Sequence, residues 1–325
     1  MLLVPFLSVV IRLIPFDMKT FRYGVFLVLL LLPSLLTART RKSNDGEPQT
    51  LAELLEGISL ASPSQWVQGM PFVFLNERVG LSLTAEVPAE ASDTTNMRGT
   101  RWFYDSMVSE EDWMGQQLLQ LRFISPQGHA YRYSTGRPMT AMTDTTYHPA
   151  LAIMYPEELI RQTDSLLRAR TFYILYNDDR IFYPADSLPG VVTHQKFVPV
   201  RIDSVSYGTE TAPLRVAFTK DDEQGYFLAS LPGSRQNATS TPLTRYLSIT
   251  DPYDQHPDIT SEIWAKIQYS QVQLDMTSEE VRLSWGRPSR VERGPSRNGV
   301  VEYWYYSNNR ILQFWDGRLN KIGIL

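Results

Sequence analysis

Cysteine is absent from this chain of 325 residues, and histidine occurs only four times. Without cysteine the chain forms no disulfide bond, has no Cys-x-x-Cys redox site and offers no thiolate ligand to zinc. The signatures of serine hydrolases, zinc peptidases, dinucleotide-binding enzymes and P-loop enzymes are also missing from the sequence. We therefore expect no catalytic residue, no metal site and no cofactor.

An excess of positive charge is missing as well. The chain has 31 Lys and Arg against 35 Asp and Glu, which gives a net charge of −4 and a pI near 5.7. Nucleic-acid-binding domains usually carry a basic patch and a high pI, so no nucleic-acid partner is expected. The hydrophobic content of 43% supports packed cores, and the length is typical of two or three domains.

The N-terminal segment has the pattern of a signal peptide. A basic stretch at residues 18–22 precedes an apolar run at 25–36, and Thr37 and Ala38 supply small residues for cleavage. We expect residues 1–38 to be a signal peptide with Met18 as the true start, and the protein to be periplasmic or secreted, with association with the outer membrane possible. An uncleaved membrane anchor is the alternative to cleavage. A second membrane-associated segment at residues 1–17 is the alternative to a start at Met18.

Short apolar runs separated by Gly, Pro, Asn and Asp predict a mainly β protein with an α+β C-terminus. We expect two small β-barrels or sandwiches of the SH3-like type, at residues 44–150 and 151–250. One helix is predicted at 156–168, because Pro156 stands at its first turn and acidic residues follow.

The second β module is predicted to be a duplicate of the first. Phe72 and Phe172 stand in similar apolar runs 100 residues apart, and Phe123 and Phe218 stand in similar hairpins 95 residues apart. A repeat of this length indicates duplication of a domain. The alternative is that two unrelated hairpins with glycine turns look alike.

The C-terminal region combines two helices with strands. Thr277 and Glu280 form a capping box that starts a short helix, and an amphipathic stretch at 261–269 precedes it. A polar loop is expected at 290–299, followed by three strands. The last two strands flank Asp316-Gly317, a hairpin turn signal.

The sequence Met276-Thr-x-x-Glu-Val281, with the later Gly286-x-Pro288, resembles the SmpA/OmlA family, known as BamE. The resemblance covers residues 261–324 and implies a two-helix, three-strand domain at 255–325. It also implies a non-catalytic envelope protein that binds partners, in outer-membrane assembly or maintenance. Family members usually have Gly where this chain has Asp275, and many are acylated on a cysteine, which this chain lacks. It is therefore not a Cys-acylated lipoprotein.

Aromatic residues of the C-terminal strands are the candidate partner-binding face. Because Glu302 is the one charged member of its strand face, we expect that face to point away from the helices. We therefore expect Trp304, Tyr306 and Trp315 to contact an envelope protein or a glycan, or the neighbouring β module.

The sequence leaves two other functions open. A secreted hydrolase would need a site assembled from scattered groups, for which His129, His148 and Asp144 are the candidates. An SH3-like module that binds peptides or the cell wall is the other. Metal-ligand residue types cluster in the sequence at Asp251, Asp254, His256 and Asp258, but Asp-Pro and His-Pro pairs favour a linker with turns there.

Overall fold

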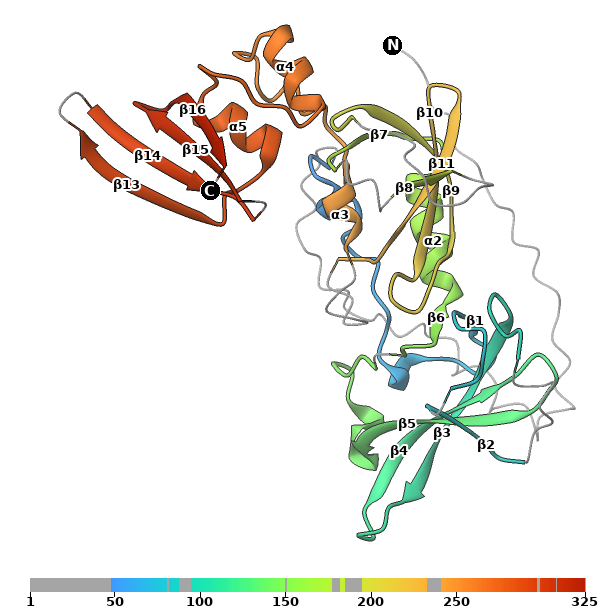
Figure 1. The fold of residues 1–325 in the computed structure, drawn as a ribbon. Helices are drawn as coiled ribbons and strands as arrows, with labels where there is room; N and C mark the ends of the chain where they lie inside the picture. Colours follow the sequence, from blue (N-terminus) through green and yellow to red (C-terminus); the bar gives the residue numbers. More distant parts are fainter. Residues whose placement is uncertain are drawn as a thin grey trace, which may run out of the picture. The chain divides into compact units, whose positions relative to one another are not determined.

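A computed structural model describes residues 48–80, 82–87, 95–149, 151–176, 182–184, 195–232, 241–296, 299–307 and 309–324. The predicted signal peptide lies outside these residues. The described part is mainly β, as predicted, and its strands pair antiparallel in three sheets (Figure 1).

The first sheet has the strand order β2-β5-β4-β3-β1-β6. Its strands are β1 (Pro71–Phe74), β2 (Leu83–Ala85), β3 (Arg101–Glu111), β4 (Gln117–Ile124), β5 (Ala130–Pro138) and β6 (Met154–Pro156). Two 3₁₀ turns accompany it, η1 (Pro63–Gln65) and η3 (Met139–Thr143). Aromatic side chains fill its core, including the fully buried Phe72, Trp102 and Phe123.

The second sheet has the strand order β12-β7-β9-β10-β11-β8. Its strands are β7 (Thr171–Ile174), β8 (Phe182–Pro184), β9 (Pro199–Tyr207), β10 (Leu214–Lys220), β11 (Glu223–Ala229) and β12 (Leu247–Ser248). Three helices contribute to the core of this module: α1 (Leu51–Leu54), α2 (Glu157–Leu167) and α3 (Leu243–Tyr246). The predicted helix at 156–168 is therefore present as α2.

The two sheets share one topology. If the strands of each sheet are numbered from one to six along the chain, the first sheet has the order 2-5-4-3-1-6. The second sheet has the same order when it is read from β8 to β12. The pairing register agrees with both predicted correspondences: Phe72 and Phe172 each lie on the first strand of their module, and Phe123 and Phe218 each lie on the fourth. The two modules therefore agree in strand order and in the strands that carry these residues.

An aspartate stands at the same irregularity in each sheet. Asp105 is skipped in the pairing of β3 with β4, and Asp203 is skipped in the pairing of β9 with β10. A bulge turns the extra residue out of the ladder. Each carboxylate accepts hydrogen bonds from side chains, Asp105 from Arg122 and Asp203 from Thr219. The bulge is thus a feature that both modules keep, with different partners.

In the first module this aspartate belongs to a network of ion pairs. The guanidinium nitrogens of Arg122 lie 2.6 Å from a carboxylate oxygen of Asp105 and 3.0 Å from one of Glu86. Arg132 Nε lies 2.7 Å from the other carboxylate oxygen of Glu86. Hydrogen bonds from Arg122 and then Arg132 hold the pKa of Glu86 below its usual value of 4.5. Hydrogen bonds from Arg122 and Gln68 hold the pKa of Asp105 below 3.8.

Arg122→Gln is expected to lower the unfolding free energy at neutral pH by about 1–2 kcal/mol, because the network is only partly buried. A carboxylate with a depressed folded pKa stabilises the fold above its usual pKa, and this contribution is lost as the pH falls through the folded value. Stability should therefore decline below about pH 4.5 in the natural chain, and less steeply in the variant.

Urea denaturation across this pH range measures both effects. Arg161→Gln is the matched control, since Arg161 pairs with Glu158 on the exposed side of α2. An acid slope that is the same for Arg122→Gln and the natural chain would contradict the assigned network.

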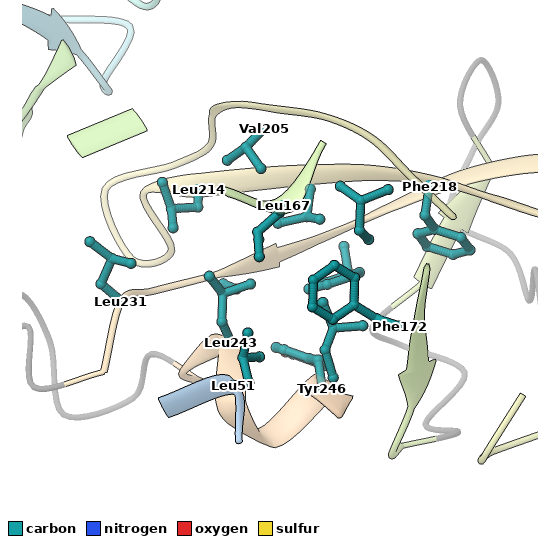
Figure 2. Packing of buried hydrophobic residues seen from close by; sticks show 14 of the residues in the cluster. Leu51, Leu167, Phe172, Val205, Leu214, Phe218, Leu231, Leu243 and Tyr246 are labelled. Carbon is teal, nitrogen blue, oxygen red and sulfur yellow. The ribbon is translucent and has the colours of Figure 1, made fainter. Parts of the chain in front are cut away.

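The core of the second module is not built from that module alone. It contains Leu51 and Leu55 from the N-terminal segment, and Val73 and Leu75 from β1 or just after it. Figure 2 shows Leu51 beside Leu243, within the same cluster as Phe172. The two β modules are therefore joined by shared packing as well as by the chain.

The C-terminal domain has two helices followed by a sheet in the order β13-β14-β15-β16. Its elements are α4 (Ser261–Gln268), α5 (Ser278–Trp285), β13 (Arg290–Ser296), β14 (Gly299–Tyr305), β15 (Arg310–Trp315) and β16 (Arg318–Ile324). The expected loop at 290–299 is wrong, because most of it forms β13 and the sheet has four strands. β13 is an edge strand, where charged residues, Gly294 and Pro295 are tolerated because one side of the backbone is unpaired.

The local signals at the helix start and the hairpin are confirmed. Thr277 Oγ1 accepts a hydrogen bond from the Glu280 N–H, and the Glu280 carboxylate accepts one from the Thr277 N–H at 2.6 Å. Asp316 and Gly317 both have positive φ, 45° and 79°, as a type I′ turn requires.

Candidate functional site

The structure reverses the predicted faces of the C-terminal sheet. Trp304 is fully buried and packs with Leu312, Phe314 and the residues of α4 and α5. The prediction that the face with Glu302 and Trp304 points away from the helices is therefore wrong. Trp304 lies in the core of its own domain and offers no free surface to a partner.

The reason for the error is the environment of Glu302. Its carboxylate accepts a hydrogen bond from the Trp304 indole N–H at 2.8 Å and another from Arg293 at 2.7 Å. Arg293 lies on β13, directly opposite Glu302. The edge strand thus supplies the counter-charge, and the carboxylate is accommodated on the helix-covered face beside the indole.

The other two predicted residues lie in different places. Tyr306 is half-buried, and its ring meets Trp285 edge-on at 5.3 Å. Its hydroxyl donates to the Gly286 carbonyl at 3.2 Å, and burial raises its pKa to about 12. Trp315 belongs to the opposite face of the sheet and keeps 38% of its surface exposed.

An aromatic and aliphatic patch covers the face of the sheet that the helices leave open. Directly paired residues share a face. The register pairs Val301 with Trp315, Tyr303 with Gln313, and Tyr305 with Ile311. We call the outer patch the set Val301, Tyr303, Tyr305, Ile311 and Trp315. Its Tyr303 is 37% exposed and its other members besides Trp315 are half-buried.

Charged residues border the outer patch. The Arg290 guanidinium lies 4.0 Å from the centre of the Tyr305 ring, and the Tyr305 hydroxyl donates to Glu292 at 2.9 Å. The hydrogen bond to Glu292 raises the pKa of Tyr305. An apolar centre with a charged border is the usual anatomy of a surface that binds another protein.

A second feature is a cleft of about 520 Å³, lined by residues of the second β module and of the C-terminal domain. Three cationic side chains line it, Lys196, Arg282 and Arg310, and none of the described lining residues is a carboxylate. Among the described residues none of these three forms an ion pair. We call this feature the cationic cleft.

Lys196 occupies the end of helix α5. Its buried ammonium group donates to the carbonyl oxygens of Leu283 and Ser284, in the last turn of the helix. These carbonyls have no partner within a helix and carry its partial negative charge, so a cation there is favourable. Burial lowers the pKa of Lys196 to about 8.

Sequence reasoning missed the cationic cleft. Its cations are far apart in the chain, at positions 196, 282 and 310, and follow no spacing rule. The contact of the segment before β9 with α5 brings Lys196 to the cleft that Arg282 and Arg310 line.

The hydrolase candidates do not line the cationic cleft. His129, His148 and Asp144 are exposed. Asp144 accepts hydrogen bonds from the Thr146 hydroxyl at 2.7 Å and the Thr146 N–H at 2.8 Å, and these lower its pKa. A carboxylate held in this way is a weaker base than usual.

Metal-ligand residue types do not converge in the part of the chain that the structure describes, where no three of His, Asp and Glu are placed to hold an ion. In the linker, His256 Nδ1 instead lies 3.1 Å from Glu279 Oε1. As for membrane contact, none of the helices formed by the described residues has the length and apolar character to cross a bilayer.

The chain matches no family model, and it matches neither a curated protein nor a solved structure.

Proposed function

We propose that this chain is a non-catalytic, exported cell-envelope protein whose C-terminal domain binds a protein partner. The observation that carries the proposal is the outer patch, where Tyr303 and Trp315 stand exposed on a sheet whose opposite face is filled by its own helices. Large aromatic side chains in such patches supply much of the energy of protein association.

The BamE-like identity of the C-terminal domain is part of this proposal. Two helices followed by an antiparallel sheet are the order that the resemblance implies, with β13 as an added edge strand. With this identity, the protein would take part in assembly or maintenance of the outer membrane. We also propose that the two β modules are SH3-like, because their antiparallel sheets are short-stranded and curled.

A protein fits the outer patch better than a glycan does. Val301 and Ile311 add aliphatic surface between the aromatic rings, and Arg290 and Glu292 form an ion pair at its border. An aliphatic and aromatic centre with paired charges around it matches protein interfaces.

Photo-crosslinking in the producing cells tests the proposal. With a photoreactive amino acid at Gln313, opposite Tyr303 on the outer patch, we expect one discrete adduct with an envelope protein. Trp315→Ala should lower the adduct yield at least tenfold, since loss of an anchoring tryptophan costs about 2 kcal/mol or more of binding free energy.

Trp113→Ala is the matched control, because Trp113 is 92% exposed on the hairpin between β3 and β4, away from the outer patch. It should leave the adduct unchanged, and both variants should keep the melting temperature. Absence of an adduct, an adduct with a glycan, or equal yields for both variants would reject the proposal.

A further inference from the structure

The cationic cleft concentrates positive charge in an acidic protein. The whole chain carries a net charge of −4, yet the described side chains that line this cleft include three cations and no acid. Its volume of about 520 Å³ is within the range of small-molecule sites. Uncompensated charge of one sign in a concave site attracts a ligand of the opposite sign.

Aromatic rings hold the cations in place. The Arg310 guanidinium lies 4.9 Å from the centre of the Trp285 ring, and the Arg282 guanidinium lies 4.6 Å from that of Trp304. Such contacts orient a guanidinium and leave its N–H groups able to donate. The Lys196 ammonium is held by the carbonyls at the end of α5, as described above. All three cations are therefore positioned before any ligand binds.

Lys196 is a buried cation that forms no ion pair with any of the described residues. Only 6% of its surface is exposed, and carbonyl oxygens are its hydrogen-bond acceptors. An anion nearby would offset the cost of burying this ammonium group. The pKa of Lys196 is lowered because burial penalises the charged form.

We propose that the cationic cleft binds a small ligand that carries an oxyanion group, phosphate or carboxylate, next to a flat ring. The oxyanion lies against Arg310 and Arg282, whose N–H groups match two oxygens at once. The ring packs on Trp285 and Tyr306, which line the same cleft. This site is separate from the outer patch and does not rest on the proposed partner.

Calorimetric titration of the full chain at constant ionic strength tests the site with three probes, phenyl phosphate, benzoate and phenol. We expect one site for at least one of the two anions, with an affinity at least tenfold above that for phenol. The preference between the anions assigns the ligand to the phosphate or the carboxylate class.

Variants locate the binding. Arg310→Gln and Arg282→Gln should each lower the affinity for the preferred anion at least tenfold. Both side chains are exposed enough to be replaced without unfolding the domain. Arg290→Gln is the matched control, because Arg290 also stacks on a ring of this domain, that of Tyr305, but lies outside the cleft. No binding of either anion, affinity equal to that for phenol, or equal effects of Arg290→Gln and Arg310→Gln would overturn the proposal.

Discussion

Replacing Trp304 by alanine is expected to lower the unfolding free energy of the C-terminal domain by about 3–5 kcal/mol. Trp304 is fully buried, and its ring centre lies 4.4 Å from that of Phe314. The substitution leaves a cavity in the core, removes the indole donor of Glu302 and takes away the ring beneath Arg282. Hydrogen exchange of peptides from residues 261–324, measured in the full chain, reports the loss.

The control for this prediction is Trp113→Ala, since Trp113 is the most exposed tryptophan of the described region. It should change the unfolding free energy by less than about 0.5 kcal/mol. If exchange in residues 261–324 were as slow in Trp304→Ala as in the control, the assignment of Trp304 to the core would be wrong.

Gly208→Ala is expected to destabilise the second β module by about 3 kcal/mol. A Cβ at this position would overlap the backbone oxygen of Ala212 and lie 3.0 Å from the carbonyl carbon of Leu214. Backbone atoms cannot swing aside as a side chain can, so the β9–β10 loop must open. That loop also accepts a hydrogen bond from Arg98 of the first module, at the Gly208 carbonyl.

Gly80→Ala separates this steric effect from the general effect of adding a methyl group. A Cβ added at Gly80 would meet no atom within 4 Å, and the φ of Gly80 is not positive. Chemical denaturation should show little change for Gly80→Ala and a clear loss for Gly208→Ala. Equal midpoints would mean that the loop is looser than the structure shows.

Local sequence signals predicted much of the fold because they act within a few residues. The capping box at Thr277, the hairpin at Asp316-Gly317 and the helix after Pro156 each depend on neighbours in the chain. The strand β13 was missed because its Gly, Pro and charged residues are typical of loops. Pairing with β14 stabilises an extended conformation that the residues of β13 do not favour by themselves.

The candidate site was predicted in kind but not in place. An exposed aromatic face exists, and Trp315 belongs to it. On β14, however, the residues predicted to point outward are the buried ones, and the residues predicted to be buried lie on the outer face. A single charge was a poor guide to the exposed face, because Arg293 on the unrecognised strand neutralises Glu302. The cationic cleft could not be predicted, since it depends on tertiary contacts between residues more than 80 positions apart.

The shared core of the second module has a consequence for the synthesis of the chain. Leu51 and Leu247 belong to one hydrophobic cluster, so the cluster that begins with Leu51 is complete only when a residue almost 200 positions later has been made. At typical rates of synthesis this wait is on the order of 10–40 s. During that time the cluster still lacks Leu243, Tyr246 and Leu247. We expect folding of this protein to depend on a holding chaperone that covers its early segments until residues 243–247 arrive.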